Sequence, residues 1–333
     1  MMSEHRDSTR PSEPPTVAVT GAAGYVGSRG LQQLQPTHTE RDLTALDNQD
    51  RGQVAAVGDD EIAHVDIRDR QRLETALAGA DVVMHLAAVS GVDDCENNPD
   101  LAYEVNVAGT NNVAWFCRQT GAALAFPFSM AVLGDPGRFP ITADLPRDPL
   151  NWYGRTKLLG EQAVETYAEG AFPAHQFLKS NLYGEHSIDG TVVSKPTVIN
   201  FFVGRALDGE PLTVYEPGSQ SRNFIHVNDV ARVYVRSAEQ LLDALAAGET
   251  GATAYEVASD EDPSVQVVAE TVASLAGEEL GVEPEVTLVE NPRAGETMVE
   301  EFGVDTGQTK TELGWTPTHT VEESVRSLLR RRG

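Results

Sequence analysis

A glycine-rich loop between an apolar strand and a helix constrains the fold of this chain most. The apolar run at 16–20 leads directly into TGAAGYVG (20–27), and the helical pattern that follows ends at Pro36. Glycines let the backbone turn tightly and approach a diphosphate, whose charge is met by free N–H groups at the helix start. This order predicts a dinucleotide site. The residues expected to line it are Gly21, Gly24, Tyr25, Val26 and Gly27.

A carboxylate follows twenty residues beyond Gly27, at the end of the second apolar run. Asp47 closes the segment LTALD (43–47). Its oxygens can accept hydrogen bonds from the ribose hydroxyls of adenosine, and its charge would repel a 2′-phosphate. We therefore expect NAD rather than NADP. A structural glycine turn beside an unrelated surface aspartate is the alternative.

Short apolar runs alternate with longer amphipathic segments over the first 180 residues. This alternation predicts an α/β fold, a Rossmann-like doubly wound parallel sheet, with a smaller C-terminal lobe. Strands are expected at 16–20, 43–47, 81–88, 122–129 and 175–180, and a helix at 153–169. The expected parts are a tail (1–14), an NAD-binding domain (15–180) and a mainly substrate-binding lobe (181–333), with a strand near 253–259 that returns to the sheet.

The charge composition limits the partners. The chain has 25 Lys and Arg against 51 Asp and Glu, a formal charge of −26, and only four of the cations are lysines. No basic surface for nucleic acid or an anionic membrane is expected. Dispersed surface carboxylates are tolerable where salt screens them, so the composition resembles that of halophilic archaeal proteins. An acidic surface that binds a partner is the alternative.

The cysteines and the first residues exclude other classes. Cys95 and Cys117 cannot make a disulfide framework and have no Cys/His spacing, so no metal is expected. The segment MMSEHRDSTRPSEPP has no apolar stretch, and no later run is long enough to cross a membrane. A cytoplasmic location is expected.

A tyrosine and a lysine stand four residues apart in YGRTK (153–157). On a helix this spacing places both side chains on one face. A free phenol has a pKa of about 10, and a nearby ammonium group would move Tyr153 toward use as a base near neutral pH. A half-buried tyrosine beside a solvated lysine is the alternative, and the glycine loop argues against it.

Taken together, these motifs resemble the short-chain dehydrogenase/reductase superfamily, in particular its extended branch, the nucleotide-sugar epimerase and dehydratase family. The resemblance runs from about residue 16 to 329. Each motif is weak alone, but their order is specific. The matching segments are TGAAGYVG, LDN (46–48), VDIRD (65–69), HLAA (85–88), NVAGT (106–110), FSMAVLG (128–134), YGRTK, NLYG (181–184), RNFIHVNDVA (222–231), RAGE (293–296) and LGWTP (313–317).

This resemblance implies the remaining cofactor contacts. Asp66 and Ile67 match residues at the adenine edge, and Asn106 matches an asparagine that supports the backbone of the active site. Beyond the glycine loop, the implied NAD contacts are Asp47, Asn48, Asp66, Ile67, Leu86, Ala87, Ala88, Asn106, Tyr153 and Lys157.

The same resemblance implies the catalytic and substrate residues. Ser129 would hold the substrate oxygen whose proton Tyr153 removes, while Lys157 tunes the tyrosine. The implied substrate contacts are Ser129, Asn181, Thr213, Tyr215, Arg222 and Arg293. Two arginines suit a diphosphate because guanidinium groups make bidentate, permanently charged contacts. The chain departs from the family pattern at Leu133, Leu178 and Asn223, where Tyr, Arg and Asp are common.

An implied reaction follows from what the site lacks. Dehydratases of the family carry an Asp-Glu pair after the catalytic hydroxyl, whereas this chain has Met130 and Ala131. The resemblance therefore implies epimerisation of a UDP-hexose at C4, through hydride transfer to bound NAD and a 4-keto intermediate. A nucleotide-sugar dehydrogenase or reductase of the same fold, and a noncatalytic NAD-binding sensor, are the alternatives. A homodimer through the helices near 100–119 and 153–169 is also implied.

Overall fold

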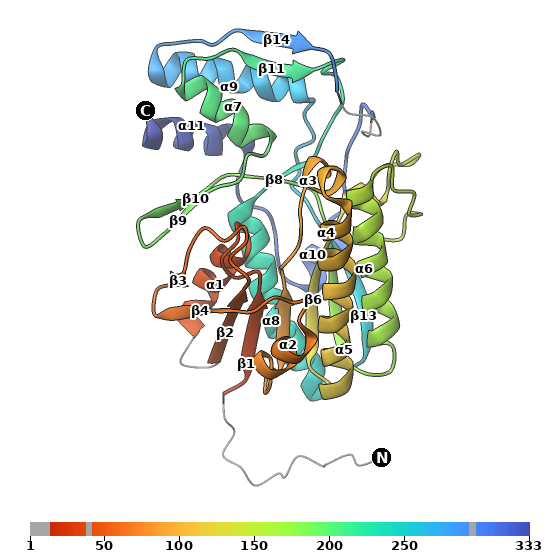
Figure 1. The fold of residues 1–333 in the computed structure, drawn as a ribbon. Helices are drawn as coiled ribbons and strands as arrows, with labels where there is room; N and C mark the ends of the chain where they lie inside the picture. The colour runs from red at the N-terminus through yellow and green to blue at the C-terminus, as the bar shows by residue number, and fades with distance from the viewer. Residues whose placement is uncertain (1–13, 38–41, 293–297) are drawn as a thin grey trace.

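A central parallel sheet organises the structure. The computed structural model describes residues 14–37, 42–292 and 298–333, and Figure 1 shows helices packed against the sheet. Eight strands lie in the order β13-β7-β6-β5-β1-β2-β4-β3. All neighbouring pairs are parallel except β3 and β4. The strands are β1 (Thr16–Thr20), β2 (Asp42–Asp47), β3 (Ala56–Val57), β4 (Asp60–His64), β5 (Val82–His85), β6 (Ala123–Ser129), β7 (Pro173–Lys179) and β13 (Gly251–Val257).

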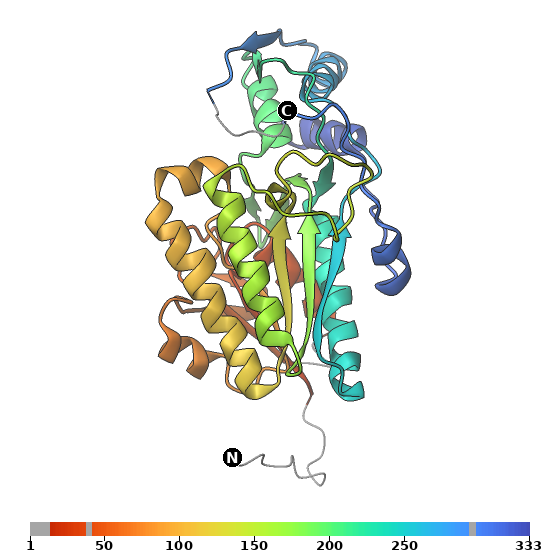
Figure 2. The same cartoon turned by 90° about the vertical axis from the view of Figure 1, so that its right-hand side faces the viewer.

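Helices cover both faces of this sheet, which confirms the predicted Rossmann-like class. Val17 and Val19 of β1 share a core with α1 and α8, whereas Ala18 between them faces the core formed with α5 and α6. Side chains alternate along a strand, so one strand supplies both layers. Figure 2 shows α5 and α6 side by side on one face of the sheet. These helices are α1 (Gly27–Leu34), α2 (Arg70–Ala76), α5 (Thr110–Thr120), α6 (Trp152–Ala168) and α8 (Val227–Ala247).

Two expected elements have different limits. The strand expected at 81–88 spans only Val82–His85. The amide of Leu86 makes the last hydrogen bond to β1, at the Thr20 carbonyl, and the backbone of Ala87 then passes against Gly21 of the glycine loop. The helix expected near 100–119 is divided. Its pieces are α4 (Pro99–Tyr103), a π-helical turn (Glu104–Gly109) and α5, and a separate short helix, α3 (Val92–Asn97), precedes them. Such π-turns are frequent at functional sites, and Asn106 lies in this one.

A second lobe lies beyond the carboxyl ends of the strands (Figures 1 and 2). It contains three two-stranded sheets and its own apolar core. Its strands are β8 (Asn181–Tyr183), β9 (His186–Ile188), β10 (Thr191–Val193), β11 (Leu212–Tyr215), β12 (Phe224–His226) and β14 (Val286–Val289), and its helices are α7 (Val198–Leu207), α9 (Val265–Leu280) and α11 (Val321–Arg332). Helix α10 (Gly307–Glu312) packs against β13 of the main sheet instead. β13 pairs with β7 in the main sheet, so the chain crosses between the lobes. The tail expected at 1–14 lies outside the described residues except for its last residue.

A buried aspartate attaches the C-terminal segment to α8. The Asp229 carboxylate accepts hydrogen bonds from the backbone amides of Thr318 and His319, each at 3.1 Å, and from Arg232 at 2.6 Å. The indole of Trp315 donates to the Asp229 carbonyl at 2.9 Å. Burial alone would raise the pKa of this carboxyl, but the hydrogen bonds from His319 and Thr318 outweigh it and lower the pKa to about 2. These hydrogen bonds hold the segment around Trp315 against the start of α8.

Replacing Asp229 by Ala is expected to lower the free energy of unfolding by about 3–5 kcal/mol, because Arg232 and two backbone amides lose their buried partner. Urea denaturation at neutral pH measures this loss. Asp260→Ala is the matched control, since Asp260 pairs with Lys310 at the surface and should contribute less than about 1 kcal/mol. Equal losses for both variants would contradict the role of Asp229.

Candidate active site

The glycine loop approaches the end of β5 so closely that side chains cannot fit. A Cβ on Gly21, whose φ is +73°, would lie 2.5 Å from the Ala87 nitrogen, and one on Gly27 would lie 2.0 Å from the Gly21 oxygen. Among the described residues, the backbone amides of Tyr25 and Val26 have no hydrogen-bond acceptor. These two donors stand at the start of α1, so the loop fits the diphosphate of a dinucleotide.

Asp47 holds this loop in place. Its carboxylate accepts hydrogen bonds from the amides of Ala23 at 3.1 Å and Gln49 at 2.7 Å, and each oxygen keeps capacity for a ribose hydroxyl. The side chain of Tyr25 lies elsewhere. Its hydroxyl donates to the Gly184 carbonyl at 2.6 Å, so only the backbone of Tyr25 is available to a cofactor.

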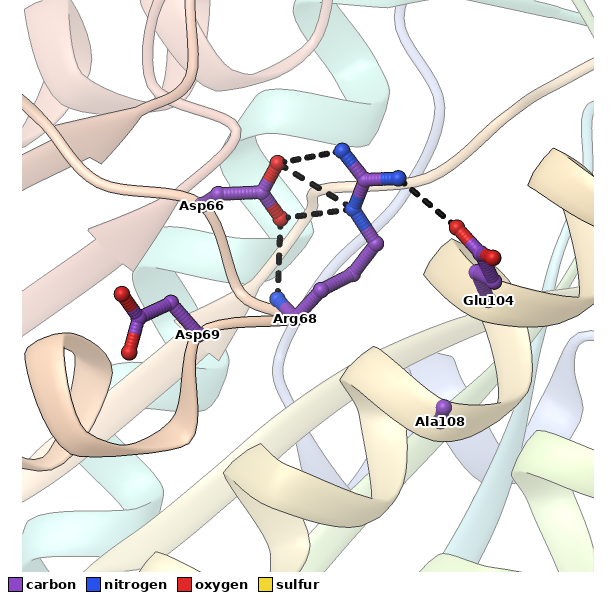
Figure 3. Close-up of a pocket in the computed structure, with 5 residues that line it drawn as sticks. All are labelled: Asp66, Arg68, Asp69, Glu104 and Ala108. Atoms are coloured by element: carbon purple, nitrogen blue, oxygen red, sulfur yellow. Dashed lines mark hydrogen bonds and ion pairs between the residues drawn. The ribbon is translucent and has the colours of Figure 1, made fainter.

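An open pocket of about 400 Å³ lies beside Asp66, one of the two residues expected at the adenine edge (Figure 3). The guanidinium of Arg68 bridges the carboxylates of Asp66 at 2.7 Å and Glu104 at 2.8 Å. Hydrogen bonds from Arg68 lower the pKa of Asp66 to about 2. The amide of Asn48 also donates to Asp66, at 3.2 Å. Asp66 is therefore an ionised acceptor at this site, and its partner Arg68 was missed from the sequence.

Ile67 and Asn106 support the cofactor site through packing and hydrogen bonds. Ile67 is buried against Gly109, where a Cβ would lie 2.5 Å from the Ile67 Cδ1 atom. The Asn106 side chain accepts from the Val89 amide and donates to the Val89 carbonyl, both at 2.9 Å. It also donates to the Thr156 hydroxyl at 3.1 Å. Asn106 thus ties the loop after β5 to helix α6.

Helix α6 carries the tyrosine and the lysine into contact with the end of β6. The Asn151 side chain caps the helix by accepting from the Gly154 amide at 2.9 Å. A Cβ on Gly154 would lie 2.4 Å from the Ala131 carbonyl, so only glycine allows this approach. Tyr153 is consequently buried beside Ser129, with which it is hydrogen-bonded.

The electrostatics of Tyr153 differ from the expectation. Burial raises the pKa of this phenol, while hydrogen bonds from Ser129 and Ser90 and the charge of Lys195 act in the opposite direction. The expected net lowering by Lys157 was wrong for this structure, because the phenolate would lose more hydration than its neighbours replace.

Three of the four lysines gather at this site. Burial and mutual repulsion lower the pKa of Lys157 to about 7, and burial lowers that of Lys179 to about 8. Lys195 donates to the carbonyl of Ser90 at 2.6 Å. Ser90 and Lys195 were missed from the sequence, although the scarcity of lysine in this arginine-rich chain was a usable signal.

The expected substrate residues lie in the second lobe. The side chain of Asn181 donates to the Asn223 carbonyl at 3.1 Å, and Arg222 is partly buried and donates to the Ser221 carbonyl at 2.7 Å. The Asn223 amide accepts from the Ser259 nitrogen and donates to the Ser259 carbonyl. An ionised aspartate could not donate, which explains the departure from the family pattern here.

The other expected substrate residues are Thr213, Tyr215 and Arg293. Thr213 and Tyr215 lie on β11, which pairs in parallel with β14. Arg293 lies outside the described residues.

Within the described ranges, no group of three metal-binding side chains occurs. In the same part of the chain, no helix combines the length and apolar character needed to cross a membrane.

Fold and site together define an NAD-dependent enzyme with a Tyr–Lys pair. Residues 17–250 match the NAD dependent epimerase/dehydratase family, and the chain belongs to that family. UDP-glucose 4-epimerase of Corynebacterium glutamicum is 29% identical over 317 residues, 91% of each chain.

Solved structures of similar fold also contain NAD. The complex of Thermus thermophilus UDP-glucose 4-epimerase with NAD has a TM-score of 0.78 and 26% identity, and covers 96% of this chain and 99% of that chain. MoeE5 in complex with UDP-glucuronic acid and NAD also has a TM-score of 0.78 and 26% identity, with 95% and 99% covered. The fold and the cofactor class predicted from the sequence are thereby confirmed.

Replacing Lys179 by Met is expected to raise the melting temperature of the ligand-free protein by a few degrees at pH 7. The folded protein holds this lysine at a pKa of about 8, whereas the unfolded chain keeps it protonated to about pH 10. The free-energy cost of burying the charged Lys179 on folding is therefore full below pH 8. It disappears as the pH rises past about 10, where the unfolded chain also loses this proton. Calorimetry across this range tests it, with Lys310→Met as the surface control. A lower melting temperature for Lys179→Met at pH 7 would refute the prediction.

Proposed function

We propose that this protein is a UDP-hexose 4-epimerase that works through Tyr153, with Ser129 and Lys157 beside it. The observation that carries the proposal is the buried tyrosine hydrogen-bonded to Ser129 where β6 ends. In doubly wound sheets, ligands bind outside the carboxyl ends of the strands, near the point where the strand order reverses. Here that point lies between β1 and β5, next to β6.

These residues account for the proton transfers at one carbinol carbon. Ser129 orients the C4 hydroxyl of the sugar, and Tyr153 removes its proton at the phenolic oxygen. The charge of Lys157 offsets part of the cost that burial places on the phenolate. NAD, when bound, supplies a reversible hydride acceptor. Tyr153 later returns the proton after the 4-keto sugar has turned its other face toward the same residues.

The two residues after Ser129 favour epimerisation over elimination of water. Met130 and Ala131 follow Ser129, so the sequence supplies no carboxylate for elimination of water at these positions. A dehydrogenase or reductase would use the same residues but consume its cofactor. Turnover of UDP-glucose to UDP-galactose without net NADH formation separates the two reactions.

Tyr153→Phe is expected to lower turnover by several orders of magnitude and to leave NAD affinity nearly unchanged. The reason is that the phenol acts only in the chemical step. Chromatography of UDP-sugars in high salt measures turnover, and fluorescence titration measures NAD binding. Tyr167→Phe, on the same helix but packed on Trp115, is the matched control. Wild-type turnover in Tyr153→Phe would leave the NAD-binding sensor as the better hypothesis.

We also propose that Asp47 selects NAD over NADP. Asp47→Asn removes the charge that would repel a 2′-phosphate, while its oxygen can still accept from the Ala23 amide. The ratio of NAD to NADP affinity should therefore fall in the variant. Isothermal titration with both cofactors checks this, and equal affinities in the wild type would rule the proposal out.

A homodimer through the outer faces of α4, α5 and α6 is a further part of the proposal. Tyr103 on α4 and Leu159 on α6 are 48% and 40% exposed, unusually high for large apolar side chains. Burying both in a twofold interface would remove them from water. The double variant Tyr103→Asp, Leu159→Asp should be monomeric by light scattering in molar KCl, where the wild type is dimeric. A monomeric wild type would disprove the interface.

A cytoplasmic location and adaptation to high salt stay predictions from the composition. The formal charge of −26 creates repulsion across the folded surface. At 1 M salt the Debye length is about 3 Å, so repulsion between surface charges farther apart than this is largely screened. Assays of this protein are therefore best performed in concentrated KCl.

A further inference from the structure

Three lysines at the active site make no ion pair among the described residues. Within the part of the chain that the structure describes, no carboxylate lies in ion-pair distance of Lys157, Lys179 or Lys195. The one other lysine, Lys310, is paired with Asp260 at 3.0 Å. Although the chain has 51 acidic residues, none of those that the structure describes makes an ion pair with the three site lysines, and the charge of Asp94 acts on Lys195 only from beyond that distance.

Such an arrangement disfavours the ligand-free fold. Ammonium groups withdrawn from water require compensation, and like charges nearby add repulsion. Lys157 is repelled by both Lys179 and Lys195. A single ammonium is enough to stabilise one phenolate. Lys157 stands one helical turn from Tyr153, and the charge of Lys195 also acts on this phenol. With Lys179, the site therefore holds two ammonium groups more than Tyr153 needs. The surplus charge points to an anion that arrives with a ligand.

The two surplus lysines lie on opposite sides of the catalytic residues. The sheet order β7-β6-β5 places Ser129, at the end of β6, between them. Lys179 is opposite Ser129 in the register of β7 and β6. Lys195 contacts Ser90, which follows β5 and is itself hydrogen-bonded to Tyr153.

The position of the lysines relative to the C4 carbon of the sugar indicates which anion they would bind. In a nucleotide sugar the diphosphate is attached at C1, across the ring from the C4 carbon that Tyr153 would serve. The cofactor diphosphate belongs at the glycine loop on α1. The groups next to C4 are those on C3 and C5, and C5 carries C6. An anion held beside Tyr153 is therefore a carboxylate at C6.

We propose that Lys179 and Lys195 form a carboxylate subsite and that the substrate is a nucleotide-linked hexuronate, an inference that rests on the proposed epimerase function. Turning the ring over at C4 exchanges the positions of the C3 and C5 substituents. Lysines on both sides of Ser129 meet the carboxylate in either orientation, one before the turn and the other after it. This accounts for two ammonium groups where one would hold a fixed ligand.

The test compares UDP-glucuronate with UDP-glucose on the full chain in concentrated KCl. The wild type should prefer UDP-glucuronate about tenfold or more in kcat/KM, the effect of one charge-assisted hydrogen bond. Lys179→Met and Lys195→Met should each reduce this preference about tenfold, mainly by raising KM for the uronate. Lys310→Met, the matched control outside the site, should keep the wild-type preference.

Binding to Tyr153→Phe gives a second readout that needs no turnover. Titration should show tighter binding of UDP-glucuronate than of UDP-glucose, and Lys195→Met in this background should remove the difference. Epimerisation of UDP-glucose without preference for the uronate would overturn the carboxylate subsite and leave the proposed function standing. If neither sugar is epimerised, the proposed function fails, and equal affinities of the two sugars would overturn the subsite as well.

Discussion

The approach of the glycine loop to the end of β5 is the constraint on which the site depends. Gly21 lies against Ala87 with no room for a Cβ, and Gly27 lies equally close to Gly21. This contact places the start of α1, with its free amides, over the point where the strand order reverses. Side chains on these glycines would move α1 away from the sheet, and the donors for a diphosphate would lose their common direction.

Residues that hold the backbone in this protein are also those expected to meet the ligands. Asp47 binds the glycine loop, and Asn106 joins the loop after β5 to α6. Gly154 allows α6 to lie against the chain after Ser129. The same hydrogen bonds and close contacts therefore set both the fold at the carboxyl ends of the strands and the position of Tyr153.

Arginine and lysine have different places in this acidic chain. Arginines form most surface ion pairs, such as Arg326 with Glu279 and Arg68 with Glu104. Guanidinium is permanently charged and suits such bidentate pairing, whereas an ammonium group loses its proton readily when buried. The lowered pKa values of Lys157 and Lys179 follow from that difference. Three of the four lysines thus lie where burial lowers their pKa values.

The sequence by itself determined the local elements and the residues that lie on them at regular spacing. The strand and helix around the glycine loop, Asp47 at the end of β2, and the Tyr153–Lys157 pair follow from periodicity within one element. Only the tertiary structure decided which distant segments meet. Lys195 reaches Ser90 across 105 positions, and the amide of Asn223 is needed because Ser259 offers it both a donor and an acceptor. Such contacts depend on how the lobes pack, and chain spacing carries no information about that.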